Sequence, residues 1–177
     1  MQDLAVNQIQ ISRVSAARTG DRTAFDELVG VHLEAGYRVA LAILRDPDEA
    51  RDAVQEAAFK AWRRLGQLRD GRAARPWFLT IVANQCRSVR RGRWWSVVRI
   101  PSVDRMSADF ETPSAESADL QRGLARLAPE DRLPLFLYFY LDLPLEEVGV
   151  VLGLSAAGAK TRVYRAARKL RPGLELD

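Results

Sequence analysis

The sequence has almost no cysteine or histidine: among 177 residues each occurs once, as Cys86 and His32. A single cysteine cannot form an internal disulfide, and His32 has no cysteine or histidine partner nearby with which to hold a metal. Cys86 is therefore expected to pack as a small hydrophobic side chain. The sequence predicts a protein with no metal and no cofactor, in a reducing cytoplasm.

Long apolar runs and catalytic signatures are also missing. No run approaches the ~20 apolar residues that span a bilayer, and the N-terminal stretch MQDLAVNQIQISRVSAARTGD has neither the basic start nor the apolar block of a secretion signal. There is no Walker loop, dinucleotide-binding fingerprint or HExxH motif, and no set of acid, base and nucleophile can be assembled. We expect no membrane insertion, no small-molecule substrate and no enzymatic activity.

Charge, by contrast, is abundant and is segregated along the chain. The net charge is only +4, with a pI of about 9.6. Two blocks, residues 87–99 and 155–171, carry arginine or lysine without any acid, and the stretch between them favours acid. This segregation indicates two separate surfaces that face a polyanion such as nucleic acid.

Helical periodicity recurs along most of the chain, whereas strand signals are scarce. A first helix is expected to end at Asp46-Pro47, and a second to begin with Asp48 and Glu49 in its first turn. A third is expected over residues 77–91. The stripe expected to be buried in the first helix consists of Phe25, Leu28, Val29, Leu33, Tyr37, Ala40, Leu41 and Leu44.

The periodic pattern is lost from residue 94 to about residue 118 and resumes at Asp119. The intervening prolines and scattered serine and acidic residues are typical of a linker. The sequence therefore predicts an all-α protein of two small helical bundles joined by a flexible linker. The expected N-terminal bundle covers residues 1–95, the linker residues 96–118 and the C-terminal bundle residues 119–177.

The stretch LPLEEVGVVLGLSAAGAKTRVYRAARKL has the pattern of a helix-turn-helix within that C-terminal bundle. Gly153 suits the turn because glycine takes a positive φ at no steric cost, and Ser155 is a natural N-cap. Beyond the cap an apolar stripe repeats every three or four residues, and the basic side chains fall away from it. A solvated basic helix on an ordinary bundle is the simpler alternative, but turn, cap and stripe together favour a helix that enters the DNA major groove.

The stretch LARLAPEDRLPLFLYFYLDLPLEEVGVVLGLSAAGAKTRVYRAARKLR resembles the promoter −35-reading region of the extracytoplasmic-function (ECF) sigma factors. DPDEARDAVQEAAFKAWRRL is similar to the family's polymerase-binding helix, and RPWFLTIVANQCRSVRRGR to the helix that follows its −10-reading loop. The resemblance covers residues 12–93 and 119–171, with the two regions in the family's order. It implies a dissociable factor whose partners are core RNA polymerase, through the β′ clamp helices and the β subunit, promoter DNA and an anti-sigma factor.

The resemblance also implies roles for individual residues. The β′ clamp helices would be bound by Asp52, Gln55 and Glu56. The −10 element would be bound by Arg69, Arg72, Arg75, Asn84, Arg87, Arg90 and Arg91. The −35 element would be bound by Ser155, Lys160, Thr161, Arg162, Tyr164, Arg165 and Arg168, with Lys160, Thr161 and Arg165 facing the bases. Asn84 has an equally good alternative, which is to satisfy buried backbone groups.

Three departures from the family's pattern are visible. Gly149 stands where the family usually has alanine, which weakens that helix by ~1 kcal/mol. Gly158 stands where threonine is usual, so a hydroxyl that would contact phosphate is missing, and Ser88 stands where aspartate is common. Two other functions remain as alternatives: a stand-alone helix-turn-helix regulator, which leaves RDAVQEAAF unexplained, and a helical scaffold that binds only protein.

Overall fold

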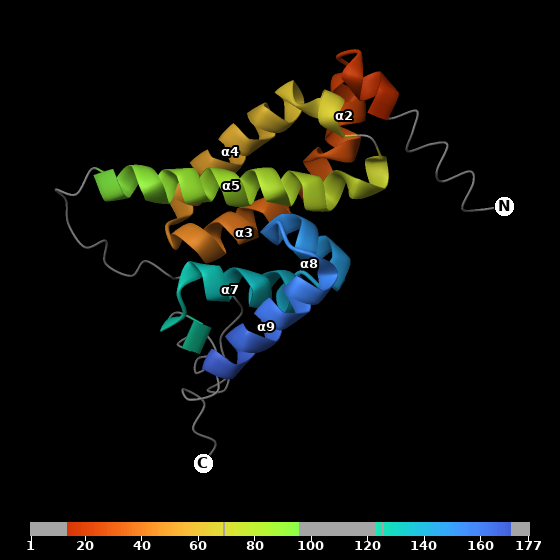
Figure 1. Cartoon of the computed structure of the whole chain (residues 1–177). Helices are drawn as coiled ribbons and strands as arrows, with labels where there is room; N and C mark the ends of the chain where they lie inside the picture. Colours follow the sequence, from red (N-terminus) through yellow and green to blue (C-terminus); the bar gives the residue numbers. More distant parts are fainter. Residues whose placement is uncertain (1–13, 69, 96–122, 125, 171–177) are drawn as a thin grey trace, which may run out of the picture. The chain divides into compact units, whose positions relative to one another are not determined.

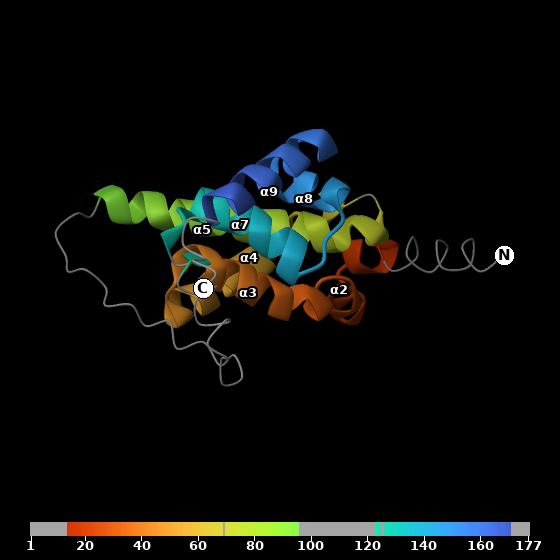
Figure 2. The ribbon, with the colours of Figure 1, turned by 90° about the horizontal axis from the view of Figure 1, so that it is seen from below.

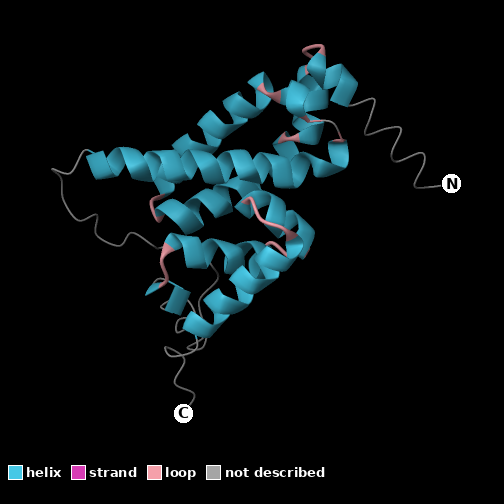
Figure 3. Ribbon diagram, in the orientation of Figure 1, coloured by secondary structure: helices cyan, strands magenta, loops and turns pink. Residues whose placement is uncertain are grey.

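A computed structural model describes residues 14–68, 70–95, 123–124 and 126–170 of the chain (Figure 1). Every regular element in these ranges is helical, as the sequence predicts (Figure 3). Contacts between Cα atoms divide the chain into two units, residues 1–98 and 99–177. The fold is therefore all-α with two helical bundles. The expected linker lies outside the described residues, and the bundle boundaries stay a prediction.

Three helices form the body of the N-terminal unit: α3 (Leu33–Leu44), α4 (Pro47–Arg63) and α5 (Ala74–Trp95). Each of them packs against the other two (Figure 2). Residues 14–18 are helical and are followed by α2 (Arg22–Leu28) and the short 3-10 turn η1 (Gly30–His32). Two further 3-10 turns, η2 (Leu65–Gln67) and η3 (Gly71–Ala73), connect α4 to α5.

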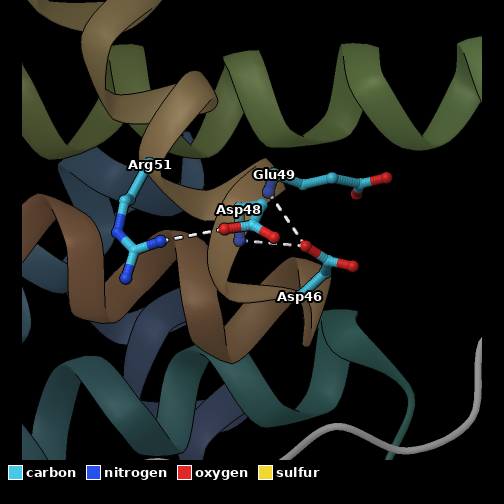
Figure 4. A network of polar contacts seen from close by, with 4 residues as sticks. All are labelled: Asp46, Asp48, Glu49 and Arg51. Atoms are coloured by element: carbon cyan, nitrogen blue, oxygen red, sulfur yellow. Dashed lines mark hydrogen bonds and ion pairs between the residues drawn. The ribbon is translucent and has the colours of Figure 1, made fainter.

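The start of α4 is fixed by Asp46, whose extended backbone precedes Pro47. One Asp46 carboxylate oxygen accepts hydrogen bonds from the amides of Asp48, at 3.0 Å, and Glu49, at 2.9 Å (Figure 4). Asp48 in turn pairs with Arg51 at 2.9 Å. Capping of this kind satisfies amides that have no partner inside the helix. The expected break and restart of the helix at this point are confirmed.

The buried face of α3 differs from the expected stripe. The buried residues are Gly36, Val39, Ala40, Ile43 and Leu44, whereas Leu33 is 39% exposed and Tyr37 and Leu41 are only half-buried. The expectation of one continuous helix from Phe25 to Leu44 was wrong, because the 3-10 turn η1 separates α2 from α3. The apolar spacing read across η1 therefore does not give the buried face of α3. Gly36 lies on this face, where α3 meets α5.

The C-terminal unit is built on α7 (Pro129–Leu135), α8 (Leu145–Leu152) and α9 (Ala156–Leu170), and α9 packs against both α7 and α8. A wide π-type turn, η4 (Phe136–Tyr140), follows α7, and in it the Leu141 amide donates to the Phe136 carbonyl at 3.0 Å. Pro134 lies inside α7, where it has no N–H to donate to the preceding turn. The bundle's core contains Leu137, Leu143, Val148, Val151 and Val163.

Two neighbouring charged residues near the start of α7, Asp131 and Arg132, are buried. Arg132 is 7% exposed, and its guanidinium donates to the carbonyls of Leu124 at 2.9 Å and Leu127 at 2.7 Å. Its neighbour Asp131 accepts a hydrogen bond from Lys169 of α9 at 2.5 Å. Two charged side chains thus tie α7 to the preceding segment and to the end of α9.

Candidate nucleic-acid interface

The turn between α8 and α9 has the geometry that the sequence predicts. Gly153 lies in the left-handed region, at φ 69° and ψ 35°, and ends α8. The Leu154 amide donates to the Gly149 carbonyl at 2.8 Å, which closes the turn as in other glycine-terminated helices. The Ser155 hydroxyl then accepts from the Gly158 amide at 3.1 Å, so Ser155 is the N-cap of α9. The helix-turn-helix is therefore present, and its turn and cap are confirmed.

Gly149 has a steric role in this turn. A Cβ atom on Gly149 would lie 2.6 Å from the Leu154 carbonyl oxygen and 3.2 Å from the Ser155 carbonyl carbon, both of which belong to the backbone. Glycine lets α8 approach the turn more closely than any other residue would. The lower helix propensity expected for Gly149 is thus offset by close packing of the helix against the turn.

The exposed side of α9 carries most of the residues expected to bind the −35 element. Ala159, Val163 and Ala166 are buried against the bundle. Arg162 is half-buried and Ser155 is engaged in the cap; the exposed members of the set are Lys160, Thr161, Tyr164, Arg165 and Arg168. The Thr161 hydroxyl also donates to the Ala157 carbonyl at 3.0 Å, which leaves its oxygen lone pairs to accept. The result is a cationic helix face with a 57% exposed tyrosine, Tyr164, in its middle.

A second cationic face follows α5, which contains no acidic residue. Asn84 is exposed, and its side-chain oxygen accepts from Arg87 at 2.7 Å. The Ser88 hydroxyl donates to the Asn84 carbonyl at 3.1 Å, and Arg91 donates to the Ser88 hydroxyl at 3.1 Å. Because Asn84 is exposed and its side-chain oxygen accepts from Arg87, the structure argues against the alternative in which Asn84 satisfies buried backbone groups. Ser88 takes part in the network without adding a negative charge to it.

Two more of the expected −10 residues are Arg72, in η3, and Arg75, in the first turn of α5, while Arg69 lies outside the described residues. Asp70 is the N-cap of η3: its carboxylate accepts from the Arg72 amide at 2.9 Å and pairs with the Arg72 guanidinium at 3.2 Å. The backbone hydrogen bond from Arg72, followed by the one from its side chain, lowers the pKa of Asp70. Arg75 is half-buried, and its charge acts on His32, whose pKa is lowered by burial first and by Arg75 second.

A contact that the sequence does not reveal holds the segment before this turn. Arg18, at the end of the helix of residues 14–18, donates to the carbonyls of Gly66 at 3.3 Å and Leu68 at 2.5 Å. The residues joined by these bonds are 48 and 50 positions apart in sequence. Because helical periodicity reports only on near neighbours, no sequence signal marks this contact.

The expected polymerase-binding residues Asp52, Gln55 and Glu56 are all exposed on α4. Glu56 pairs with Lys60 at 3.4 Å, and Lys60 donates to Gln85 of α5 at 2.5 Å. One turn further along the same face, Phe59 is 57% exposed. Phe59 is not among the site residues predicted from the sequence, although its position four residues after Gln55 places both on one helix face.

Next to Phe59 the α4 face gains a positive charge, because the Arg63 guanidinium lies 5.8 Å from the centre of the Phe59 ring. Trp62 packs edge-on against Phe25, with ring centroids 5.0 Å apart. The polar and acidic first half of the face thus continues into an aromatic and cationic second half. We call the exposed side chains Asp52, Gln55, Glu56 and Phe59 the α4 ridge.

Within the described residues no helix is long and apolar enough to cross a bilayer. The described residues also contain no group of three His, Cys, Asp or Glu side chains that could hold a metal ion. The geometry defines a helix-turn-helix protein with a second cationic helix surface in a separate helical unit.

Comparison with known proteins shows to which family of helix-turn-helix proteins the chain belongs. The model of the family Sigma-70 region 2 matches residues 28–96, and that of Sigma-70, region 4 matches residues 117–170. The ECF RNA polymerase sigma factor SigM of Mycobacterium tuberculosis is 31% identical over 162 residues, which cover 89% of this chain and 80% of SigM. SigL of the same organism is 28% identical over 172 residues, covering 93% of this chain and 97% of SigL.

Solved structures agree. The sigma factor RpoE of Bartonella quintana, in complex with the anti-sigma factor NepR, superposes with a TM-score of 0.73 at 26% identity, covering 86% of this chain and 98% of RpoE. CnrH, in complex with the cytosolic domain of CnrY, gives a TM-score of 0.70 at 24% identity, covering 95% and 98%. The chain belongs to the ECF sigma factor family. It acts as an alternative sigma factor that directs RNA polymerase to promoters, and a stand-alone helix-turn-helix regulator is not favoured.

Proposed function

We propose a division of this function between the two units. Residues 1–95 hold core polymerase and open the −10 element, residues 119–177 read the −35 element, and residues 96–118 connect them. The observation that carries the proposal is the pairing of a capped helix-turn-helix, whose second helix exposes only cationic and neutral side chains, with a second acid-free helix in the other unit. If only one unit carried a DNA-reading helix, a repressor or activator would be sufficient to explain it.

In the −35 interaction, α9 enters the major groove. Lys160 and Arg165 donate to guanine edges, the commonest direct readout, and Thr161 offers its oxygen lone pairs. Arg162, Tyr164 and Arg168 meet the phosphate backbone, which positions the helix without reading sequence. Ser155 acts mainly through the cap, because its hydroxyl already accepts the Gly158 amide.

In the −10 interaction, the cationic face of α5 follows the strand that is separated from its partner. Arg87, Arg90 and Arg91 neutralise phosphates, and Asn84 stands beside them with its amide nitrogen available to a base. Arg69, Arg72 and Arg75 lie in or beside the loop before α5, where an extruded base would be captured. Extrusion costs a few kcal/mol and therefore needs a preformed pocket.

In the polymerase interaction, the α4 ridge docks on the β′ clamp helices, and the C-terminal unit approaches the β subunit. Asp52 and Glu56 give the ridge a negative charge that suits a basic partner surface. Since RpoE was solved with the anti-sigma factor NepR, we propose that an anti-sigma factor covers the same surfaces here. The chain would then work in the bacterial cytoplasm, with no catalytic activity of its own.

Transcription in vitro with bacterial core polymerase on genomic DNA tests the proposal. We expect promoter-specific transcripts only when the chain is added, and a stable complex between the chain and core polymerase. The double variant Lys160→Glu, Arg165→Glu should lose at least ~30-fold in −35-dependent transcription, because each lost base contact costs ~1–3 kcal/mol. Arg126→Glu, at an exposed position outside α9, is the matched charge reversal and should leave transcription nearly unchanged.

Three outcomes would overturn the proposal. A lack of both transcripts and a core complex would remove the sigma-factor role itself. Equal activity of the double variant and Arg126→Glu would instead favour a scaffold that contacts only protein. Tight, specific binding to duplex DNA without polymerase would favour a stand-alone regulator.

A further inference from the structure

Arg18 makes a long-range contact that is unusual in this unit, because it ends on two backbone carbonyls. Its guanidinium donates to Gly66 O at 3.3 Å and to Leu68 O at 2.5 Å. Val14 and Ala17, in the same short helix, are buried at 3% and 2% exposure. The helix is therefore seated on the core, and Arg18 reaches from that fixed base to the segment that leaves α4.

The two carbonyls belong to a segment that needs such a partner. η2 ends at Gln67, and the last carbonyls of a helical turn have no partner within the turn. Leu65 and Leu68 are buried at 3% and 2% exposure, so their side chains anchor the segment while its carbonyls face Arg18. A charged donor binds carbonyls more strongly than a neutral one does.

A second constraint lies immediately downstream. Asp70 caps η3 by accepting from the Arg72 amide at 2.9 Å. The chain from η2 to the start of α5 is therefore held by Arg18 at one end and by Asp70 at the other. Of these two polar constraints, only Arg18 comes from outside the segment, and together with the buried Leu65 and Leu68 it sets where the segment lies on the bundle.

We propose that Arg18 is a positioning residue for −10 recognition: through the carbonyls of Gly66 and Leu68 it pre-organises the connection between α4 and α5 so that an extruded base finds a formed pocket. The proposal rests on the proposed function of this connection. When a site is ordered before its ligand arrives, none of the binding free energy is lost in ordering it. Arg18 acts through the backbone it holds and touches no base.

Hydrogen exchange on the full chain tests the first half of the proposal without polymerase or DNA. The reporting amides are those of Gln67, Leu68 and Ala73, which donate to Arg64 O, Leu65 O and Asp70 O. In Arg18→Ala we expect exchange in peptides covering residues 64–74 to be at least ~10-fold faster, the size of effect that follows from losing a charged hydrogen bond. Peptides from α9 should be unchanged.

Two further variants complete the set. Arg22→Ala removes an exposed arginine at the start of α2 and is the matched control, expected to exchange like the wild type. Arg18→Lys keeps one charged donor and should lie between the wild type and Arg18→Ala. Unchanged exchange in Arg18→Ala, or uniformly faster exchange throughout the N-terminal unit, would overturn the positioning role. If Arg18→Ala does not fold, Arg18→Lys carries the same comparison.

The second half is tested on promoters found in the transcription experiment. Permanganate reactivity of thymines near −10 should fall ~10-fold for Arg18→Ala with duplex DNA. Affinity for core polymerase and use of the −35 element should stay within twofold of the wild type. Loss of core binding in parallel with melting, or full melting by Arg18→Ala, would contradict the proposal. If the wild-type chain gives no transcripts, the proposed function fails, while the exchange experiment still decides whether Arg18 holds this segment.

Discussion

Gly36 on α3 and Phe78 on α5 approach so closely that there is no room for a methyl group between them. A Cβ atom on Gly36 would lie 2.9 Å from the nearest ring carbon of Phe78 and 3.3 Å from a methyl carbon of Val82. Phe78 and Val82 are fully buried, so neither can move aside easily. The spacing between α3 and α5, and with it the position of the cationic face of α5, depends on this glycine.

We therefore expect Gly36→Ala to lower the free energy of unfolding of the N-terminal unit by about 1–3 kcal/mol, the usual range for overpacking a core. Urea denaturation followed by circular dichroism measures it. The matched control is Gly92→Ala on α5, where nothing lies within 4 Å of an added Cβ and the better helix propensity should stabilise by up to ~1 kcal/mol. Equal stability of the two variants would refute the steric argument.

The buried Arg132 gives a corresponding prediction for the C-terminal unit. Arg132→Ala leaves the carbonyls of Leu124 and Leu127 without their charged donor, which should cost about 1.5–3 kcal/mol. Urea unfolding of this unit should show the loss, together with weaker −35 binding, since α7 packs against α9. Arg126→Ala, at an exposed position, should stay within ~0.5 kcal/mol of the wild type. An Arg132→Ala protein as stable as that control would contradict the prediction.

Phe59 is expected to be an anchor of the α4 ridge. Large aromatic side chains dominate binding energy when an interface buries them, so Phe59→Ala should weaken binding of the full chain to a β′ clamp-helix fragment at least ~10-fold. Titration calorimetry gives the affinity. Phe139→Ala is the control, because Phe139 is 67% exposed in the other unit and should not affect this fragment. A twofold or smaller change for Phe59→Ala would exclude Phe59 from the interface.

His32 provides a pH prediction. Burial, and then the charge of Arg75, lower the pKa of His32 from its ordinary value of 6.5. The unfolded chain therefore takes up this proton at a higher pH than the folded chain, so the stability that His32 contributes is present above about 6.5 and is lost as the pH falls through the folded-state pKa. Titration of the imidazole by NMR should show the lowered pKa. Arg75→Ala should raise it only in part, because the larger cause, burial, remains.

Cys86 should behave as an inert thiol. Burial raises its pKa to about 12, so almost no thiolate, the reactive species, is present at pH 7–8. We expect a thiol reagent to label the native protein far more slowly than the urea-unfolded protein. Rapid labelling of the native protein would show that α5 opens readily.

The elements and the helix-turn-helix were predictable because their signals are local. Gly153 marks the turn, Ser155 the cap and Asp46 the start of α4, and each acts on residues within four positions along the chain. Phe59 could also have been found, since it departs from the apolar stripe of its helix and follows Gln55 by one turn. The buried face of α3 was predicted only in part, at Ala40 and Leu44, because η1 changes the helical phase while the apolar pattern continues through it.

The contacts that hold the candidate site in place were not predictable in this way. Arg18 meets Leu68 across 50 positions and Lys60 meets Gln85 across 25, and the apolar spacing of one helix contains no information about either pairing. The close approach of Gly149 to the Leu154 carbonyl likewise depends on the path of the turn in space. The sequence alone predicts only that Gly149 weakens its helix, and it does not predict the close packing that requires a glycine there.

The burial of Cys86 also has a practical consequence. Since the chain has no other cysteine and this one is hidden in α5, a new cysteine placed on any exposed side chain would be the only site that takes up a maleimide dye under native conditions. Fluorescent or spin-labelled versions of the protein can be made without first removing a native thiol. Its encounters with polymerase and promoter can then be followed one molecule at a time.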